Sequence, residues 1–459
     1  MMKLAPYPDY RDAGVSWVGS IPAHWPEKRA KYYFKEIDER SQTGDEEMLS
    51  VSHITGVTPR SQKNVTMFKA ESNVGQKRCQ PGDLVINTMW AWMSALGVSN
   101  HAGIVSPAYG VYRPRSNQAY DNYYLDHLLR IEGYRSEYIC RSTGIRSSRL
   151  RLYPDKFLSM PVVCPPQEEQ QTIARFLKAQ DRLFRKFIRN KRRLIELLKE
   201  QKQNVINQAV TRGLDPKVKF KPSGVEWIGD IPEHWEVRRL KFLCHNLNEQ
   251  TSEKQPGETY IALEHVESWT GRISLPDDEI SFDSQVKRFK PGDVLFGKLR
   301  PYLAKVTRPQ TAGVCVGEFL VLRATGNVSA NFLEQKLRSK RVIDLINSST
   351  FGAKMPRADW TFIGNLKFTY PPADEQQEIL EHIQEKSAEI DQAISRAQRE
   401  IELMREYRTR LISDVVTGQV DVRGIEVPDV AEDELLALDE DTAETDDVMD
   451  DEGDMDETD

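Results

Sequence analysis

The chain has 459 residues, of which 39% are hydrophobic, and a formal net charge of −7 at pH 7. This length allows several domains with separate cores and excludes a small protein held together by disulfide bonds. Five cysteines occur without a Cys-x-x-Cys pair or a histidine at zinc-finger spacing: Cys79, Cys140, Cys164, Cys244 and Cys315. This pattern predicts neither a disulfide framework nor a metal site, and it favours the reducing cytoplasm.

No apolar run approaches the roughly 18 residues that can cross a membrane. The opening residues 1–6 lead into Tyr, Asp and Arg rather than into the apolar stretch of a secretory signal. We therefore expect a soluble protein that makes no membrane contact.

The net charge averages two unlike regions. Residues 424–459 hold 18 of the 70 acidic residues and none of the 63 lysines and arginines, so residues 1–423 carry a formal charge of +11. A basic body suits a nucleic-acid partner, because lysine and arginine near phosphates release counterions. The acidic tail is predicted to be disordered. It would serve either as a solubilising end or as a competitor of nucleic acid for the basic body.

The first half opens with a motif that returns 210 residues later. Residues 14–25 read GVSWVGSIPAHW and residues 224–235 read GVEWIGDIPEHW, with identical residues or aliphatic swaps at nine of twelve positions. The tryptophans of the two copies are Trp17, Trp25, Trp227 and Trp235. Because a proline turn lies between them, we expect them to hold each opening segment onto a core rather than to contact a ligand.

Further along, both halves contain a Pro-Gly-Asp sequence, at residues 81–83 and 291–293, which predicts a turn feeding a β-strand. Another strand-like run ends near Arg113 in the first half and near Arg323 in the second. Short helical segments and polar loops follow, at residues 123–132 and 142–149 and again at 331–346 and 348–357. Each half is therefore predicted to be a mixed α/β domain.

Each half ends in a long helical pattern. Residues 165–171 read PPQEEQQ and residues 371–377 read PPADEQQ, and about forty residues without glycine or proline follow each copy. The prolines stop the preceding segment, and the acidic residues suit the positive end of a helix dipole. Apolar residues recur at alternating three- and four-residue steps, with polar breaks at Asp181 and Lys202 in one copy and Ser387 and Arg408 in the other. This register predicts two long helices that pair as a coiled coil.

Some apolar residues of the two helical runs lie off this seam. We expect them to contact partner proteins, because a two-helix pair cannot cover them: Phe176, Phe187, Leu194, Leu197 and Leu403.

No catalytic motif is visible. Gly292, Gly297 and Lys298 satisfy part of a phosphate-binding loop, but a leucine follows where serine or threonine must coordinate Mg²⁺. The chain lacks a G-x-G-x-x-G loop, an H-E-x-x-H helix and a G-x-S-x-G elbow. The sequence therefore predicts that this chain is not an enzyme and binds no cofactor itself.

Basic, aromatic and hydroxyl side chains gather near the predicted turns and strand ends of both halves. Arginine can bind guanine through two hydrogen bonds or hold phosphates, and hydroxyl groups suit phosphate oxygens. Residues 87–99 and 297–309 diverge while the segments around them repeat, which suggests that two similar scaffolds read different targets. The predicted DNA-binding residues are Trp90, Trp92, Arg113, Ser142, Thr143, Arg146, Arg149 and Arg151 in the first half, and Lys298, Arg300, Tyr302, Arg323, Thr350, Lys354 and Arg357 in the second.

Up to about Val422, the combination of these features resembles the specificity subunits of type I restriction–modification systems. The resemblance rests on the two opening motifs, the two Pro-Gly-Asp turns, the Ser-Thr-Gly loop at Ser142 with its counterpart at residues 349–352, and the Pro-Pro-x-x-Glu-Gln-Gln helix starts. It implies an α/β (mixed α+β) fold with two similar target-recognition domains, separated by two long α-helices that form an antiparallel coiled coil with an internal pseudo-twofold repeat. The acidic tail departs from the family's usual ending.

The resemblance also implies a domain order. It comprises a first target-recognition domain at residues 1–165, a central helix at 166–213, a second target-recognition domain at 214–371, a distal helix at 372–420 and the acidic tail at 424–459.

By the same resemblance, the chain would be a non-catalytic subunit that reads a bipartite target in double-stranded DNA. It would recruit two methyltransferase subunits and restriction subunits, which would bring S-adenosylmethionine, ATP and Mg²⁺. Two other hypotheses stay open from the residues alone, a stand-alone sequence-specific DNA-binding regulator and a coiled-coil assembly scaffold without DNA binding. Co-purification with a methyltransferase, sequence-specific binding alone and absence of DNA affinity would separate the three.

Overall fold

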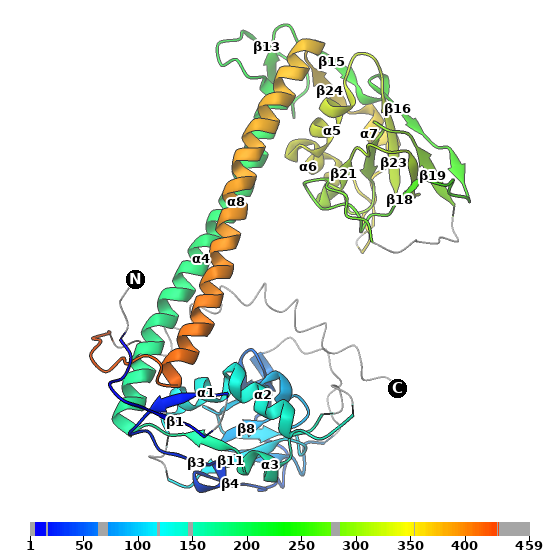
Figure 1. Cartoon of the computed structure of the whole chain (residues 1–459). Coiled ribbons are helices and arrows are strands. Elements are labelled where there is room, and N and C mark those ends of the chain that lie inside the picture. Colours follow the sequence, from blue (N-terminus) through cyan, green and yellow to red (C-terminus); the bar gives the residue numbers. More distant parts are fainter. Residues whose placement is uncertain are drawn as a thin grey trace. The chain divides into compact units, whose positions relative to one another are not determined.

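The structure is a computed structural model that describes residues 5–14, 17–62, 72–116, 120–145, 150–276, 285–352, 354–428 and 430. The chain forms two compact units, residues 1–191 with 399–459 and residues 192–398. Each unit holds one α/β domain together with half of each long helix (Figure 1). The predicted fold class is thus confirmed. In the part of the chain that the structure describes, no helix combines the length and the apolar character needed to cross a membrane.

The first unit combines helices with short strands that form several small sheets. Its strands are β1 (Tyr10–Asp12), β2 (Ser20–Pro22), β3 (Glu27–Arg29), β4 (Phe34–Glu36), β5 (Leu49–Ser52), β6 (Gly56–Pro59), β7 (Lys77–Cys79), β8 (Leu84–Ile86), β9 (Leu96–Val98), β10 (Gly103–Val105), β11 (Gly110–Pro114) and β12 (Pro161–Val163). Its α-helices are α1 (Asn122–Arg130), α2 (Glu132–Arg141) and α3 (Pro154–Leu158), and its 3₁₀ turns are η1 (Ala30–Tyr32), η2 (Arg60–Gln62) and η3 (Ala91–Met93).

The second unit repeats this order. Its strands are β13 (Phe220–Pro222), β14 (Asp230–Pro232), β15 (Glu236–Arg239), β16 (Cys244–Leu247), β17 (Gln250–Thr251), β18 (Thr259–Ile261), β19 (Val286–Phe289), β20 (Val294–Gly297), β21 (Val306–Thr307), β22 (Gly313–Val316), β23 (Phe319–Ala324) and β24 (Lys367–Tyr370). Its α-helices are α5 (Ala330–Arg338), α6 (Lys340–Ser348) and α7 (Trp360–Asn365), and its 3₁₀ turns are η5 (Leu240–Phe242) and η6 (Pro301–Leu303).

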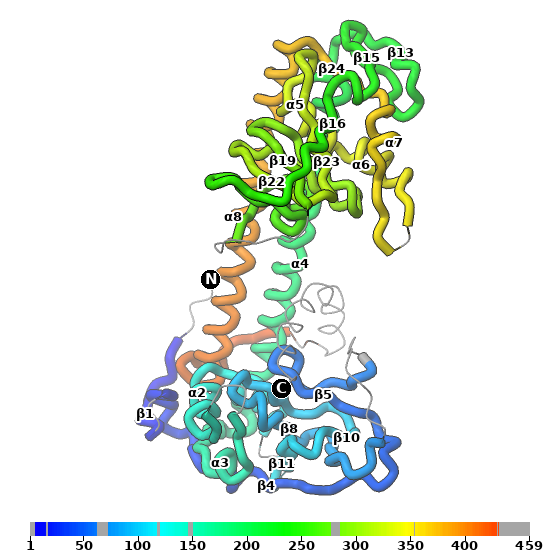
Figure 2. The backbone as a smooth tube through the Cα atoms, turned by 90° about the vertical axis from the view of Figure 1, so that its right-hand side faces the viewer, coloured from blue at the N-terminus to red at the C-terminus, as the bar shows by residue number. Residues whose placement is uncertain are grey.

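The central sheets of the two units have the same antiparallel topology. The strand order is β4-β11-β8-β9 in the first unit, as Figure 2 shows in part, and β16-β23-β20-β21 in the second. Strands β8 and β20 begin directly after the Pro-Gly-Asp turns, in which Gly82 and Gly292 have φ angles of 89° and 86° that favour glycine. The predicted turn into a strand is therefore confirmed in both halves.

The shorter helices depart from the sequence prediction in three places. The segment expected at residues 331–346 is two helices, because Ser339 has an extended backbone (φ −64°, ψ 141°) and caps both. In the first half the prediction ended at residue 132, and helix α2 beyond it was missed. Helices α3 and α7 were not predicted either. They are only one to two turns long, and their side chains show no helical period that a sequence reading could detect.

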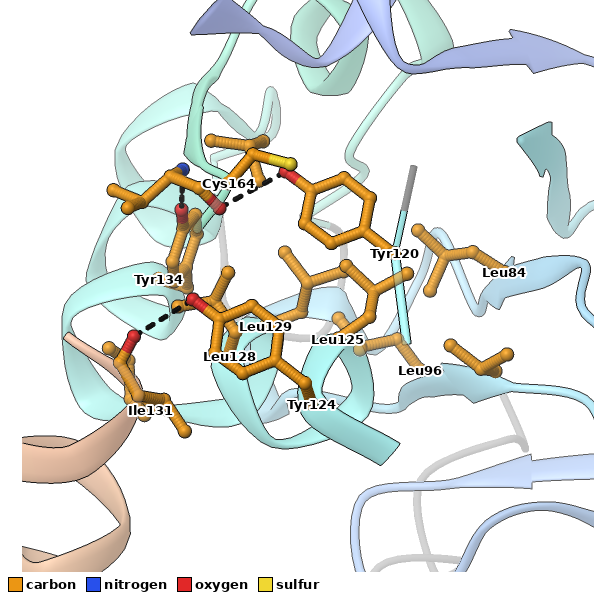
Figure 3. Packing of buried hydrophobic residues seen from close by; sticks show 14 of the residues in the cluster. Leu84, Leu96, Tyr120, Tyr124, Leu125, Leu128, Leu129, Ile131, Tyr134 and Cys164 are labelled. Atoms are coloured by element: carbon orange, nitrogen blue, oxygen red, sulfur yellow. Dashed lines mark hydrogen bonds between the residues drawn. The ribbon is translucent and has the colours of Figure 1, made fainter. Parts of the chain in front are cut away.

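The core of the first unit is rich in tyrosine. Figure 3 shows three of these rings packed against the leucines of α1: Tyr120, Tyr124 and Tyr134 beside Leu125, Leu128 and Leu129. The hydroxyls of these three tyrosines each have a backbone partner, whereas that of buried Tyr112 has none. Tyr120 donates to the Val163 carbonyl oxygen (3.1 Å), and Tyr124 donates to the Val416 carbonyl oxygen at the end of the second long helix (3.0 Å).

The long helices are α4 (Gln167–Arg212) and α8 (Ala373–Val416), which lie side by side and antiparallel (Figures 1 and 2). Every predicted seam position is buried or half-buried, which confirms the register. The polar breaks are paired. In the first unit the carboxylate of Asp181 accepts from Arg185 (2.9 Å) and Arg408 (2.6 Å), and in the second unit Lys202 donates to Asp391 (2.8 Å).

One off-seam prediction is wrong. Phe176 cannot contact a partner protein, because it is buried in the core of the first unit, whose domain covers the start of α4. Leu194, Leu197 and Leu403 are exposed, as expected, and Phe187 is half-buried.

The repeated motifs join each domain to its helix. In the first unit the carboxylate of Glu169 accepts a hydrogen bond from the Trp25 indole (3.0 Å) and lies 2.6 Å from His24 Nε2. In the second unit Glu375 makes the same contacts with Trp235 (3.0 Å) and His234 (2.6 Å). The His-Trp pair of the opening motif and the glutamate of the Pro-Pro motif therefore form one structural joint.

The neighbouring glutamine completes this joint. The Oε1 atom of Gln170 accepts from the backbone N–H of Asp121 (2.8 Å), the residue that caps α1. Gln376 makes the equivalent bond to Ser329 (2.9 Å), the cap of α5. The structural role expected for Trp25 and Trp235 agrees with their burial, 1% and 0% exposed.

The predicted acidic tail is described only at its start. Ile425 and Val427 pack against the core of the first unit, and Val430 contacts the Ala179 side of α4. Residues 431–459, which carry most of its charge, lie outside the described residues.

Candidate nucleic-acid interface

The segments that diverge in sequence follow a similar backbone path in both units, although Trp90 has a φ of −121° where Arg300 has a φ of 48°. After β8, the turn η3 is followed by Ser94 with a φ of 63°, and the chain returns through β9. After β20, the turn η6 is followed by Ala304 with a φ of 47°, and the chain returns through β21. The first segment is closed by a hydrogen bond from Asn87 N–H to the Ala95 carbonyl oxygen, and the second by an equivalent bond from Gly297 to Lys305 (both 2.9 Å).

A second loop lies against each of these turns. In the first unit the backbone N–H of Leu152 donates to the Thr88 carbonyl oxygen (2.9 Å), and Thr143 and Arg151 pair through two backbone hydrogen bonds of 3.0 Å. In the second unit Ala358 donates to Lys298 (2.9 Å), and Phe351 and Arg357 form the corresponding pair (3.3 and 3.1 Å). The two loops that the sequence analysis singled out in each half are thus neighbours.

The second unit brings its predicted residues together most closely. Arg300 N–H donates to the Pro356 carbonyl oxygen (2.8 Å), and Leu299 bridges to Arg357, so the two loops form one surface. Exposed on this surface are Arg300, Tyr302, Lys354 and Arg357, while Lys298 is half-exposed. We call these five residues the second reading surface. Arg357 also contacts the carboxylate of Glu318, at 3.2 Å from Nη2.

Lys287 lies close to this surface. Its ammonium group donates to the Phe319 carbonyl oxygen (2.9 Å). Burial, and to a smaller extent nearby Lys298, lowers the pKa of Lys287.

The first unit presents a more aromatic surface. Trp90 and Trp92 are half-exposed at η3, and the Trp92 indole donates to the Met89 carbonyl oxygen (3.0 Å). Arg151 is exposed at the position that Arg357 occupies in the second unit. We call these three residues the first reading surface. The predictions for Arg146 and Arg149 lie outside the described residues.

Two predicted arginines have another partner. Arg113 donates to both carboxylate oxygens of Asp83 (2.9 Å each), and Arg323 does the same with Asp293 (2.7 Å each). Hydrogen bonds to these aspartates raise the pKa of both guanidinium groups. Because each aspartate belongs to a Pro-Gly-Asp turn and is buried, this geometry favours a structural role for the two arginines.

Three predicted hydroxyl residues hydrogen-bond to the backbone nearby. Ser142 Oγ donates to the Tyr138 carbonyl oxygen at the end of α2 (2.6 Å), and Thr350 Oγ1 donates to the Asn347 carbonyl oxygen (2.8 Å). Thr143 contributes its backbone to the pairing with Arg151. Their hydroxyl oxygens can still accept hydrogen bonds, but the structure gives no sign that they face a ligand.

Sequence reasoning missed exposed apolar residues on the same loops. Phe351 is 79% exposed and Met355 is 50% exposed beside the second reading surface, and Ile145 is fully exposed next to the first. Large apolar side chains at such exposure are uncommon and mark contact surfaces. Their position inside loops that are otherwise polar is the feature of the sequence that could have revealed them.

Among the described residues, no cluster of histidine, cysteine or acidic side chains could hold a metal ion. Cys79, Cys164, Cys244 and Cys315 are buried and form no disulfide bond, and burial raises the pKa of each thiol. These surfaces can therefore bind and position a polyanion, and they show no arrangement of a nucleophile and a base.

Some known proteins are similar to this chain in sequence. No protein-family profile matches the chain. The chain is 24% identical over 336 residues to the type I restriction enzyme MjaVIII specificity subunit of Methanocaldococcus jannaschii, which covers 68% of this chain and 73% of that protein. It is 23% identical over 432 residues to the putative type I restriction enzyme MjaX specificity subunit of the same organism, covering 88% and 96%.

Solved structures share the fold. A chain from a study of complex assembly and conformational transition in a type I R-M system matches with a TM-score of 0.62 and 14% identity, covering 87% of this chain and 99% of that one. The HsdS subunit of Thermoanaerobacter tengcongensis matches with a TM-score of 0.50 and 15% identity, covering 87% and 98%. The resemblance inferred from the motifs is thereby confirmed, since the chain is similar in sequence to type I restriction enzyme specificity subunits and shares the fold of these solved structures.

Proposed function

We propose that this chain is the non-catalytic DNA-recognition subunit of a type I restriction–modification complex and that it reads a bipartite target. The observation that carries this proposal is the pair of reading surfaces. Their backbones make the same cross-loop hydrogen bonds, yet Trp90, Trp92 and Arg151 lie on one and Lys298, Arg300, Tyr302, Lys354 and Arg357 on the other. Equivalent scaffolds with different side chains suit two half-sites of different sequence.

The proposal includes the partners. Two methyltransferase subunits would bind this chain and supply S-adenosylmethionine chemistry, and restriction subunits would supply ATP- and Mg²⁺-dependent cleavage. The stand-alone regulator and the coiled-coil scaffold are not favoured, because the relatives are specificity subunits.

The test is methylation-site sequencing of a host that carries the chain and its methyltransferase partner. We expect methylation at two short blocks separated by a spacer of fixed length. Arg151→Ala and Arg357→Ala are matched variants, since the two residues occupy equivalent positions. Each should relax the sequence at one half-site only, by roughly 1–3 kcal/mol for a lost base contact.

Other outcomes would contradict the proposal. Sequence-specific DNA binding without any methyltransferase association would identify a regulator, and a chain without DNA affinity would identify a scaffold. An equal loss at both half-sites, with a shallower dependence on salt, would show that the arginine under test contacts phosphate rather than a base.

A further inference from the structure

A second repeated surface lies outside the reading surfaces. In the first unit its exposed residues are Lys28, Arg29, Lys31, Tyr32 and Lys35, and in the second they are Arg238, Arg239, Lys241, Phe242 and His245. We call these sets the first and the second basic-aromatic patch. Each pair of equivalent positions lies 210 residues apart and keeps its chemistry: basic, basic, basic, aromatic, and lysine or histidine. The reading surfaces, by contrast, differ.

The backbone presents both patches in the same way. Ala30 in η1 donates its N–H to the Met160 carbonyl oxygen (2.7 Å), and Leu240 in η5 donates to that of Leu366 (2.8 Å). The side chains of these two residues point into the cores, and the turn therefore directs the next two residues outward. Tyr32 is 61% exposed and Phe242 is 60% exposed.

The exposed rings lie beside cations. Lys31 Nζ is 5.4 Å from the centroid of the Tyr32 ring, and Lys241 Nζ is 5.6 Å from that of Phe242. Among the described carboxylates, only Glu236 forms an ion pair with a patch residue, Arg238, at 3.1 Å. Each patch therefore combines a large exposed ring with cations that, apart from Arg238, have no ion-pair partner among the described carboxylates. Aromatic side chains and arginine are enriched at protein–protein contacts.

The patches lie at the end of each sheet that is opposite to the reading surface. On β11, Gly110 pairs with Ile86 beside η3, whereas Pro114 pairs with Phe34 beside η1. On β23, the pairings of Phe319 with Gly297 and of Ala324 with Cys244 mark the same two ends. At ~3.4 Å per residue, the patch is roughly 14 Å or more along the sheet from the DNA-reading end.

The chemistry also distinguishes the partner from DNA. Phe242 has no group that can donate to a phosphate, and the bases of an intact duplex offer no exposed face for it to stack on. A protein surface that combines carboxylates with an apolar pocket satisfies both the cations and the ring. Because the two patches are alike, their partner should be the same in both units.

We infer that each basic-aromatic patch binds an acidic, partly apolar surface on a subunit that is present in two copies, one for each unit. This inference rests on the proposed function, under which that subunit is the methyltransferase. The patches then form contacts that do not depend on the target sequence, which explains why they are alike while the reading surfaces differ.

The experiment uses the full chain co-expressed with its methyltransferase subunit and examined by native mass spectrometry. The variants are Lys31→Glu with Tyr32→Ser, Lys241→Glu with Phe242→Ser, and all four changes together. Arg272→Glu with Leu275→Ala is the matched control, because it reverses an exposed cation and removes an exposed apolar side chain elsewhere on the second unit. Lys31→Glu and Lys241→Glu alone serve if a double change lowers the melting temperature.

We expect each single-patch variant to bind one methyltransferase subunit at least about tenfold more weakly and to retain the other. The variant with both patches changed should lose both, and the control should retain both. Unaltered assembly of the four-change variant would overturn the inference. If the same variant also showed a shallower salt dependence of DNA binding, the patches would instead contact DNA phosphates. If the parental chain binds no methyltransferase subunit, the proposed function itself fails.

Discussion

The ammonium group of Lys336 lies in the core of the second unit. It donates to the carbonyl oxygen of Val210 near the end of α4 and to Thr369 Oγ1 (2.8 Å), and it lies 6.0 Å from the centroid of the Trp235 ring. The first unit satisfies the corresponding helix end differently, through the neutral hydroxyl of Tyr124. A carbonyl oxygen at the end of a long helix thus accepts a hydrogen bond in both units, but the donor is an ammonium group only in the second.

Burial lowers the pKa of Lys336 to about 7. The unfolded chain, with an ordinary lysine pKa of about 10.4, binds more protons than the folded chain above pH 7, so the stability of the second unit should rise with pH. We expect a slope approaching about 1.4 kcal/mol per pH unit between about pH 7 and 9. Urea unfolding across this range measures it. Lys336→Met should remove the slope, and Lys340→Met, at an exposed lysine, should keep it.

The buried ion pair in the first unit allows a second test. Burial alone would raise the pKa of Asp181, but Arg408 and Arg185 lower it. Removing Arg408 leaves the carboxylate with Arg185 only, and we expect a loss of about 1–3 kcal/mol in the free energy of unfolding. The lowered pKa means that the pair's contribution is present near pH 7 and is lost as the pH falls through that pKa.

A double-mutant cycle with Asp181→Leu and Arg408→Leu separates pairing from packing. The double variant should be at least as stable as Arg408→Leu alone, because it leaves no buried charge. Additive losses in urea unfolding would mean that the two side chains act independently.

At this scale the sequence predicted the polar breaks at Asp181 and Arg408 but not that they face each other. It also suggested DNA contacts for Arg113 and Arg323. Their partners Asp83 and Asp293 lie 30 residues away in the chain, in the turn that leads into a neighbouring strand. No pattern of spacing reveals such a pairing. An arginine at a strand end looks the same in a sequence whether it faces solvent or a buried carboxylate.

The elements were predictable in proportion to their length. The seam of α4 and α8 repeats over eleven positions, so its register could be read directly, and both helices begin within two residues of the predicted start. Helix α7 has six residues and β21 has two, too few for any period to emerge. The joint between Trp25 and Glu169 was also invisible, although both motifs were recognised, because the sequence does not reveal that they meet.

The outer face of α4 carries an apolar stripe beside the seam. Leu183, Leu194 and Leu197 are 57%, 41% and 45% exposed. Phe187 is half-buried and lies one helical turn after Leu183 and two turns before Leu194. We expect Leu194→Glu with Leu197→Glu to abolish assembly with the methyltransferase subunit. Stability should change by at most about 0.5 kcal/mol for each substitution, because both sites are exposed.

Co-purification of this variant with the methyltransferase measures the effect. Lys199→Glu, an exposed change on another face of α4, is the control and should assemble normally. Normal assembly of the leucine variant would show that the stripe is solvent-exposed in the complex.

For the whole molecule, the continuity of α4 through the boundary at residue 191 permits a test of spacing. Inserting three heptads into each long helix, after Lys191 and after Gln398, preserves the seam and adds about 31 Å at ~1.5 Å per residue. This length is close to one turn of B-DNA, about 34–36 Å. We therefore expect a spacer longer by about ten base pairs, with unchanged half-sites.

A single inserted heptad provides the contrast. It adds only about 10 Å, so the second half-site would turn to another side of the duplex and methylation should fail. Methylation-site sequencing reads both variants. Parental spacing in an active three-heptad variant would show that the helices do not set the distance.

The two ends of the described chain meet in the first unit. Asp421 N–H donates to the Ala5 carbonyl oxygen (2.8 Å), and Tyr10 donates to the Gly418 carbonyl oxygen (3.0 Å), so the polypeptide forms a nearly closed loop. When the two ends of a chain lie close together, they can be joined and new ends can be made at another position. Joining Val430 to Ala5 through a flexible linker keeps Val422, Ile425 and Val427 in the core of the first unit. Starting the chain in the exposed loop at Pro216 should then give a circularly permuted protein with the parental fold and target. The order in which a ribosome makes the two halves would then be arbitrary, and only their cyclic arrangement would matter.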